Sequence, residues 1–216
     1  MIDNKSIASI RKVYKLQSLL EKDVDANPVR QFEKWWQQAI ESSLDEVNAL
    51  TLSTCSPSGK PSSRIVLLKG IHEDGFVFFT NYDSRKGREM EQNPNVSLLF
   101  FWKEMERQVR VEGNAKKVSE EESDEYFNSR PRASRIGAWS SPQSQTIEDR
   151  EFLQENVLKY EKKFENTEVP RPVNWGGYIV QPRLMEFWQG RPGRLHDRLR
   201  YIQDGQNSWQ IERLAP

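Results

Sequence analysis

The 216-residue sequence predicts a mainly β protein, an antiparallel β-barrel with peripheral helices. Short apolar runs rich in β-branched and aromatic residues recur through the middle and the end of the chain, and turn sequences separate them. Most of the intervening segments are too short for the crossover helices that a parallel sheet needs. Hairpins between successive strands are therefore the simplest connection, which favours a barrel over a βαβ sheet.

The expected strands share this apolar, β-branched or aromatic character. In chain order they cover residues 49–53, 64–69, 76–80, 96–101, 108–118, 175–180, 184–189 and 198–202. Gly-, Pro- and Asp-containing turns at 56–59 and 73–75 separate the early strands.

Helix-start signals interrupt the strand pattern at four places. Asn27 is an expected N-cap ahead of Pro28, and Ser119 with Glu122 has the spacing of a capping box. Two more helices are expected over 84–93 and 146–164. Residues 1–27 are polar and weakly patterned, so we expect a mobile N-terminal arm or lid, followed by a single domain over 28–216.

The composition limits the function classes. Lys and Arg number 32 and so do Asp and Glu, so no global positive field favours non-specific nucleic-acid binding. The single cysteine, Cys55, cannot form an intramolecular disulfide, and no apolar run is long enough to span a membrane. The N-terminus lacks the basic-then-apolar layout of a secretory signal, so we expect a cytoplasmic protein.

The segment from Tyr82 to Gly87 places two cations at the expected start of a helix. Arg85 and Lys86 would lie in the first turn, where the positive end of the helix dipole disfavours positive charge. An anion would resolve this conflict, because free backbone N–H groups, the Ser84 hydroxyl and two cations together make a strong phosphate site. The alternative is a solvated Arg-Lys pair at a helix start.

The expected strand over 64–69 carries a cation at each end of an apolar run. Arg64 and Lys69 are five residues apart, so a regular strand would point them to opposite faces. Both can serve one site only if the strand bulges or ends between them. The alternative is a core strand whose terminal charges reach solvent.

Residues 194–198 read Arg-Leu-His-Asp-Arg. In an extended chain, period-two alternation would put Arg194, His196 and Arg198 on one face. Three groups that can each carry positive charge repel one another unless something anionic or electron-rich lies opposite. The alternative is an exposed basic strand in which Asp197 supplies the counter-charge.

Tyr126, Arg130 and Ser134 recur at intervals of four. Pro131 makes one unbroken helix improbable, so a helix end followed by a second short helix is expected. Such a corner can gather two hydroxyls and a guanidinium around a phosphate, although the pattern of each residue taken singly favours an ordinary surface role.

Other features carry no chemistry in this interpretation. His72 lies beside a turn, and Cys55 is expected to end a strand rather than act as a nucleophile. Trp35 and Trp36 are expected to pack. Two histidines and one cysteine make no recognised zinc spacing, and the chain has no phosphate-binding P-loop and no dinucleotide fingerprint, so no metal is expected.

Read together and in order, these segments resemble the pyridoxamine 5′-phosphate oxidase family over nearly the whole chain. The matching blocks are RIVLLKG (64–70), FVFFTNYDSRKGREMEQNP (76–94), ERQVRVEG (106–113), YFNSRPRASRIGAWSSPQS (126–144), WGGYIV (175–180), EFWQG (186–190), RLHDRLRY (194–201) and ERLAP (212–216). Arg11 and Tyr14 in the arm have the R-x-x-Y spacing that the family uses to cover its substrate.

The resemblance implies a split β-barrel homodimer that binds FMN at the subunit interface. The residues implied for FMN are Arg64, Val66, Leu67, Lys69, Phe79, Thr80, Ser84, Arg85, Lys86, Gln108, Gln143, Ser144, Trp188 and Arg198, several of them contributed across the interface. Those implied for the substrate are Arg11, Tyr14, Lys69, Tyr126, Arg130, Ser134, Arg194 and His196.

The implied reaction oxidises pyridoxamine 5′-phosphate and pyridoxine 5′-phosphate to pyridoxal 5′-phosphate. A hydride passes from substrate C4′ to flavin N5, and O₂ then takes the electrons to give H₂O₂. Arg194 is expected to orient the pyridine ring, and His196 to assist binding or proton movement. Phe79 stands where relatives often have Tyr, which leaves a hydroxyl contact in question, and residues 15–18 lack the glycines of some relatives.

Three alternatives stay open from the sequence. A related flavin oxidase acting on a phenazine precursor would share the fold and the FMN site, but would be expected to lack the set of Lys69, Tyr126, Arg130 and Ser134. A non-catalytic flavin- or pyridoxal-phosphate-binding protein need not keep residues 194–198. A nucleic-acid-binding barrel fits least well, given the neutral net charge.

Overall fold

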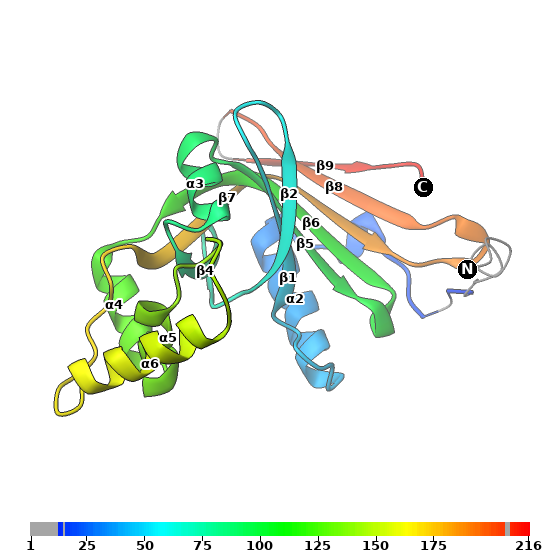
Figure 1. Cartoon of the computed structure of the whole chain (residues 1–216). Helices are drawn as coiled ribbons and strands as arrows, with labels where there is room; N and C mark the ends of the chain where they lie inside the picture. Colours follow the sequence, from blue (N-terminus) through cyan, green and yellow to red (C-terminus); the bar gives the residue numbers. More distant parts are fainter. Residues whose placement is uncertain (1–12, 15, 206–207) are drawn as a thin grey trace, which may run out of the picture. The chain divides into compact units, whose positions relative to one another are not determined.

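The computed structural model describes residues 13–14, 16–205 and 208–216 (Figure 1). The helices are α2 (Pro28–Glu41), α3 (Arg85–Gln92), α4 (Glu120–Ser129), α5 (Arg132–Ser140) and α6 (Glu151–Lys163), with 3₁₀ turns η1 (Glu21–Asp23), η2 (Lys103–Met105) and η3 (Pro192–Arg194). The strands are β1 (Ala49–Cys55), β2 (Pro61–Leu67), β3 (Gly70–His72), β4 (Gly75–Asn81), β5 (Asn95–Trp102), β6 (Arg107–Lys117), β7 (Trp175–Gln189), β8 (Asp197–Gln203) and β9 (Trp209–Arg213).

The strands form one sheet in the order β2-β1-β5-β6-β7-β4-β3, with β8 beside β7 and β9 beside β8. The pairs β1–β2, β3–β4, β4–β7, β7–β8 and β8–β9 are all antiparallel. The predicted antiparallel, mainly β class is therefore confirmed. Among the described residues, no helix is both long and apolar enough to cross a membrane.

The chain forms two compact units. The first contains the described residues up to Val47 together with Leu99–Val111 and Arg183–Pro216, and the second contains Asn48–Leu98 and Glu112–Pro182. Because β5, β6 and β7 each contribute residues to both units, this division does not decide whether 28–216 is a single domain, which stays a prediction.

An aromatic core builds the first unit around α2. Asn27 caps this helix by accepting a hydrogen bond from the Val29 backbone N–H at 2.8 Å, as its sequence predicts. Phe32 is fully buried, and its ring centroid lies 4.8 Å from that of Phe100 and 5.8 Å from that of Trp102. Trp35, predicted to pack, meets Phe187 edge-on at 5.2 Å.

The second unit combines strands with the helices α3 to α6. Buried side chains of α4, α5 and the chain after α6 form one cluster around the start of β7, made of Phe127, Ile136, Phe164, Val169 and Trp175. Helices α5 and α6 pack against each other (Figure 1). This cluster supports the corner between α4 and α5.

Two predicted boundaries are wrong. The two strands expected over 175–180 and 184–189 are one strand, β7, whose first part pairs with β4 and whose last part pairs with β8. Pro182 lies between the two paired stretches, where its missing N–H costs no hydrogen bond in either of these pairings. The helix expected from 146 begins at Glu151, because the Asp149 carboxylate accepts a hydrogen bond from the Phe152 backbone N–H and so caps the helix there. Strands β3 and β9 were not predicted.

Truncating Phe32 should test the core of the first unit. We expect Phe32→Ala to lower the free energy of unfolding by about 3–5 kcal/mol, because it removes a fully buried ring and leaves a cavity. Ile40→Ala in the same helix is the control, since Ile40 is 48% exposed and its loss should cost less than about 1 kcal/mol. Urea unfolding measures both, and equal losses would contradict this packing.

Candidate functional site

The start of α3 has the geometry that its sequence predicts. Ser84 is the N-cap, and its hydroxyl oxygen accepts a hydrogen bond from the Gly87 backbone N–H at 3.2 Å. A Cβ atom at Gly87 would lie 2.0 Å from the Tyr82 carbonyl oxygen, so only glycine fits this close approach. Arg85 and Lys86 therefore occupy the first turn, where the helix dipole opposes their charge.

Lys86 is a buried cation, 9% exposed, surrounded by neutral oxygens. Its ammonium donates hydrogen bonds to Thr80 Oγ1 and Gln143 Oε1, both at 3.2 Å, and Thr80 also donates to Gln143. Burial, followed by the charge of Arg64, lowers the pKa of Lys86 to about 8. A bound anion would offset both effects, so this group of side chains fits an anionic ligand.

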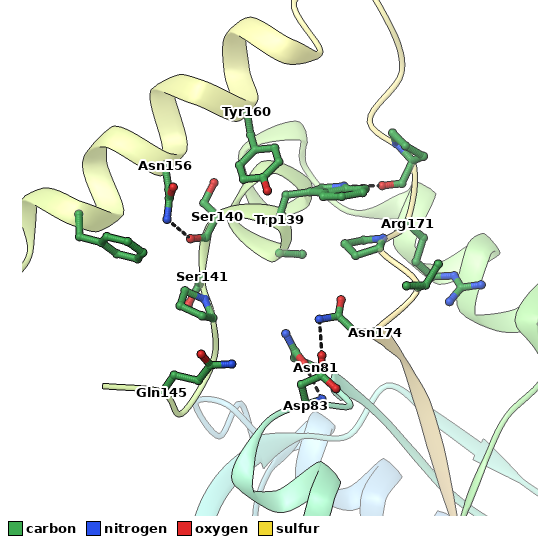
Figure 2. A pocket seen from close by; sticks show the side chains of 16 residues that line it. Asn81, Asp83, Trp139, Ser140, Ser141, Gln145, Asn156, Tyr160, Arg171 and Asn174 are labelled. Atoms are coloured by element: carbon green, nitrogen blue, oxygen red, sulfur yellow. Dashed lines mark hydrogen bonds between the residues drawn. The ribbon is translucent and has the colours of Figure 1, made fainter. Parts of the chain in front are cut away.

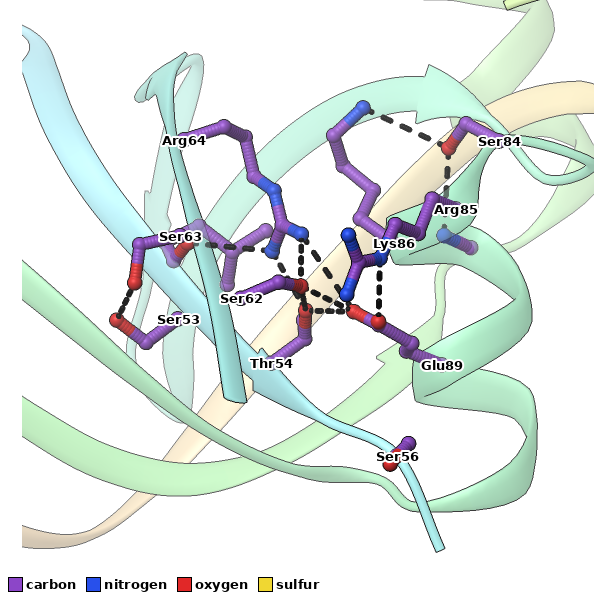
Figure 3. Close-up of polar contacts among 12 residues, drawn as sticks. Ser53, Thr54, Ser56, Ser62, Ser63, Arg64, Ser84, Arg85, Lys86 and Glu89 are labelled. Atoms are coloured by element: carbon purple, nitrogen blue, oxygen red, sulfur yellow. Dashed lines mark hydrogen bonds and ion pairs between the residues drawn. The ribbon is translucent and has the colours of Figure 1, made fainter. Parts of the chain in front are cut away.

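Arg64 reaches the same end of α3 from strand β2 (Figure 3). Its guanidinium donates to Thr54 Oγ1 at 2.5 Å and to Ser62 Oγ at 2.6 Å, and lies 3.5 Å from the Glu89 carboxylate. Arg85 donates to the same carboxylate from Nε at 2.8 Å. Burial lowers the pKa of Arg64, and the charge of Glu89 partly offsets this.

Strand β2 ends at Leu67, between the two cations of its segment. This is one of the two arrangements that would let Arg64 and Lys69 serve one site. Lys69 is exposed in the link to β3, and its backbone N–H donates to the Val77 carbonyl at 2.8 Å. Val66 is half-buried and Leu67 is exposed, so the edge strand presents apolar side chains to solvent.

The corner between α4 and α5 confirms the predicted break at Pro131. Arg130 ends α4, and its guanidinium carbon lies 4.6 Å from the ring centroid of Trp175. Within the described residues, its buried Nη1 atom has no hydrogen-bond partner, and burial lowers the pKa of this guanidinium. Such an orphaned donor fits an anion that accepts from it.

Phe79 supports this corner with an aromatic face. Its ring stacks on Tyr126 at 4.0 Å between centroids and on Trp175 at 5.6 Å. Ser134 is half-buried in the first turn of α5. Phe79 therefore packs against one of the residues predicted for substrate binding, although it has no hydroxyl to donate.

In the first unit, the predicted residues Gln108, Trp188 and Arg198 sit on β6, β7 and β8. Trp188 and Arg198 are cross-strand partners, so their side chains share a face. The buried Glu186 carboxylate lies two residues before Trp188 and accepts from Arg198 Nε at 2.7 Å and from Arg110 at 2.6 Å. This contact raises the pKa of Arg198 and fixes its guanidinium.

Tyr14 and His196 meet Trp188 at the end of β7. Ring centroids lie 5.7 Å apart for Tyr14 and Trp188, and 4.6 Å apart for Trp188 and His196. A Cβ atom at Gly190 would lie 2.8 Å from Tyr14 Cγ, so the Tyr14 ring can pack here only because residue 190 is glycine. His196 Nδ1 accepts from the Arg191 backbone N–H at 3.1 Å, and burial with the charge of Arg194 lowers the pKa of His196.

The prediction that Arg194, His196 and Arg198 alternate along one strand is wrong. Strand β8 begins only at Asp197, and Arg194 ends the 3₁₀ turn η3 in the left-handed region, with φ 63°. Gly193 before it also has positive φ, which turns the chain out of extended geometry. Arg194 is consequently exposed, and His196 lies in the turn before β8.

Two further predicted residues remain to be placed. Ser144 is exposed with φ 68°, next to Gln143 in the link after α5. Arg11 lies outside the described residues.

Sequence reasoning missed Glu89, Glu186 and Trp175, which hold or face the predicted arginines. The spacing of four residues between Arg85 and Glu89 on one helix could have revealed the first. The other two are joined to their partners only by tertiary structure.

A separate pocket of about 570 Å³ lies in the second unit between α5, α6 and residues 170–174 (Figure 2). Trp139, Tyr160 and Asn156 line it, and Asn174 donates to Asp83 at its edge. None of the predicted FMN or substrate residues lines this pocket.

The antiparallel sheet, the buried Lys86 at the start of α3 and the orphaned donor of Arg130 define a β protein with two places that fit an anionic ligand. Sequence models of two families match the chain: "Pyridoxamine 5'-phosphate oxidase" over residues 36–164, and "Pyridoxine 5'-phosphate oxidase C-terminal dimerisation region" over residues 175–216. The chain belongs to the pyridoxamine 5′-phosphate oxidase family.

Curated relatives are similar along their entire length. The pyridoxine/pyridoxamine 5′-phosphate oxidase of Trichormus variabilis is 54% identical over 213 residues, covering 99% of this chain and 100% of the relative. That of Paraburkholderia xenovorans is 57% identical over 212 residues, covering 98% and 99%.

Solved structures confirm the split-barrel fold. PhzG from Burkholderia lata, in complex with tetrahydrophenazine-1-carboxylic acid, has a TM-score of 0.87 at 32% identity and covers 93% of this chain and 99% of its own. A pyridoxamine 5′-phosphate oxidase-related, FMN-binding protein from Nostoc punctiforme has a TM-score of 0.69 at 19% identity, covers 93% of this chain and 100% of its own, and supports the fold alone.

Replacing Lys86 should test its buried charge through the pH dependence of stability. The pKa of Lys86 is about 8 in the folded protein, against 10.5 for an ordinary lysine. Between these values the unfolded chain binds more protons here than the folded protein, so the contribution of Lys86 to the free energy of unfolding rises with pH. We expect the free energy of unfolding of the wild type, relative to that of Lys86→Met, to increase as the pH rises from about 8 to 10.5. Urea unfolding without ligand measures both proteins. A difference that is constant or falls with pH would contradict the lowered pKa.

Proposed function

We propose that this chain is an FMN-dependent oxidase that converts pyridoxamine 5′-phosphate and pyridoxine 5′-phosphate to pyridoxal 5′-phosphate, in the synthesis and salvage of vitamin B6. The observation that carries the proposal is the presence, in one unit, of two cationic places suited to two phosphates. One is at the start of α3 and the other is at Arg130. An enzyme that brings a phosphorylated cofactor to a phosphorylated substrate needs both.

The donors at α3 fit the FMN phosphate. Arg64, Arg85 and Lys86 supply positive charge, while Ser84 and Thr80 supply hydroxyls. Lys86 bonds only to neutral oxygens among the described residues, so a phosphate would provide the counter-charge that its burial requires. Val66, Leu67, Lys69, Phe79, Gln143 and Ser144 complete the proposed FMN set in this unit, with Gln108, Trp188 and Arg198 in the other.

The second group fits the substrate phosphate. Arg130 offers a buried donor without a partner, and Tyr126 and Ser134 stand four residues before and after it. Lys69 adds a further cation in the proposed site. Arg130 is held over Trp175, so its guanidinium is already desolvated on one face before a ligand arrives.

When bound, FMN supplies the hydride acceptor and passes the electrons on to O₂. The protein's own groups then bind, orient and exclude water. Because His196 Nδ1 accepts a backbone hydrogen bond, the neutral ring carries its proton on Nε2, where it can donate to the substrate. Arg194 orients the pyridine ring in this proposal, while Arg11 and Tyr14 cover the substrate.

We also propose that the enzyme is a homodimer with FMN at the subunit interface. The family's dimerisation region covers residues 175–216 and so contains Trp188, Arg194, His196 and Arg198. Residues that bind FMN and substrate would then come from both subunits. A monomer would have an incomplete site.

The phenazine-precursor alternative is not favoured. PhzG is 32% identical to this chain, whereas the pyridoxine/pyridoxamine 5′-phosphate oxidases reach 54–57% along the whole chain.

Anaerobic mixing of the FMN-loaded protein with pyridoxamine 5′-phosphate should test the activity. We expect the flavin absorbance to bleach, and admission of air to restore it with formation of pyridoxal 5′-phosphate and H₂O₂, because substrate oxidation and flavin re-oxidation are separate steps. Absorbance spectroscopy and a peroxide assay measure the two halves. A flavin that binds but does not bleach would contradict the assignment of pyridoxamine 5′-phosphate as substrate.

Replacing Arg130 should separate phosphate recognition from the oxidation itself. We expect Arg130→Gln to raise KM for pyridoxamine 5′-phosphate about 10- to 100-fold, because a charge-assisted hydrogen bond to the phosphate is lost. The oxidation of pyridoxamine, which has no phosphate, should change little. Arg132→Gln is the matched control, because exposed Arg132 bonds only to the Phe164 and Thr167 carbonyls among the described residues. Equal effects on both substrates would rule out a phosphate contact.

A further inference from the structure

Glu89 is a buried carboxylate that lies between two arginines of the proposed FMN site (Figure 3). It stands one helical turn after Arg85 and is 7% exposed. One oxygen, Oε1, accepts from Arg85 Nε at 2.8 Å. The other, Oε2, accepts from Thr54 Oγ1 at 2.5 Å and Ser62 Oγ at 2.6 Å, and lies 3.5 Å from Arg64 Nη2.

The hydroxyl groups around Glu89 form a fixed cradle. Thr54 and Ser62 are cross-strand partners in the β1–β2 hairpin, and each also accepts a hydrogen bond from Arg64. The hairpin therefore holds the carboxylate and the Arg64 guanidinium in one network. Glu89 links this network to α3, which carries Arg85 and Lys86.

Glu89 remains charged in this cradle. Burial by itself raises the pKa of a carboxyl group, but the hydrogen bonds from Ser62, Thr54 and Arg85 outweigh it and lower the pKa of Glu89 to about 2. The carboxylate is thus ionised at every pH at which the protein would work.

Arg85 keeps most of its donors for a ligand, whereas Arg64 keeps only its Nε–H, because its terminal nitrogens donate to the Leu52 carbonyl, Thr54, Ser62 and Glu89. A guanidinium has five N–H donors, and Glu89 engages only Nε of Arg85. Among the described residues, the two terminal nitrogens of Arg85 make no hydrogen bond. The charges also balance, because three cations and one carboxylate leave a net charge of two, about that of a phosphate monoester dianion.

We propose that Glu89 is a positioning residue for the FMN phosphate, which holds Arg64 and Arg85 in fixed orientations with the terminal nitrogens of Arg85 and the Nε–H of Arg64 available to it. This inference rests on the proposed FMN site. The opposite expectation comes from charge alone, since a nearby carboxylate should repel a phosphate and its removal should tighten FMN binding. The direction of the change therefore distinguishes positioning from simple repulsion.

The test compares FMN with riboflavin, which lacks the phosphate, by quenching of flavin fluorescence on the FMN-free protein. We expect Glu89→Gln to weaken FMN binding about 10- to 100-fold and to change riboflavin binding less than about twofold, because only the phosphate contacts lose their geometry. Glu89→Asp should restore part of the FMN affinity. Glu91→Gln is the matched control, since Glu91 is an exposed residue of the same helix paired with Lys117.

An unchanged or tighter FMN affinity in Glu89→Gln, or equal weakening of both flavins, would overturn the positioning role. Arg64→Gln and Arg85→Gln separate this failure from failure of the site itself. If neither weakens FMN binding, the proposed FMN site is wrong; if both do and Glu89→Gln does not, only the positioning role is wrong. Should Glu89→Gln not fold, Ser62→Ala replaces it, with an expected FMN-selective loss of about 3- to 10-fold, and an unchanged ratio of the two affinities overturns the role.

Discussion

The burial of Lys86 is the constraint on which the proposed site depends. A lysine in the first turn of a helix is opposed by the helix dipole, and here it is also desolvated and close to Arg64. The fold accepts this cost because Ser84 caps the helix and Gly87 lets the turn pack closely on Tyr82. Neutral oxygens from Thr80 and Gln143 hold the ammonium without neutralising it. Among the described residues, the ammonium therefore has hydrogen-bond partners but no counter-charge.

Both units use a buried carboxylate to hold arginines. In the second unit Glu89 contacts Arg64 and Arg85, and in the first unit Glu186 contacts Arg110 and Arg198. An arginine side chain loses considerable rotamer freedom when a ligand orders it, so fixing it beforehand lowers the cost of binding. This arrangement explains how a chain of zero net charge can gather several cations locally, since each local excess of positive charge is limited by a nearby acid.

Local sequence signals predicted much of the fold and the candidate site, and tertiary contacts account for the rest. The Asn27 and Ser119 caps, the helix start at Ser84, the break at Pro131 and the cation pair at α3 could be predicted because a few neighbouring residues determine them. The prediction of an extended strand through Arg194 was wrong because Gly193 and Arg194 adopt positive φ. The alternation of residue types along the sequence does not reveal such backbone angles. The contacts of Glu89 with Thr54 and Ser62 could not be predicted because these residues come from a hairpin 35 and 27 residues earlier, whereas its contact with Arg85 lies within one helix. The resemblance to the oxidase family supplied the assignment of residues to FMN and substrate.

We propose that the cations at α3 bind the FMN phosphate as a dianion, and ³¹P NMR of the FMN-loaded protein tests this binding most directly. A free phosphate monoester takes up a proton with a pKa of about 6. Three cations around the bound phosphate should stabilise its dianion, so we expect a ³¹P shift that stays constant from neutral pH to well below that value. A bound phosphate whose shift titrates near pH ~6, as in free FMN, would contradict the account.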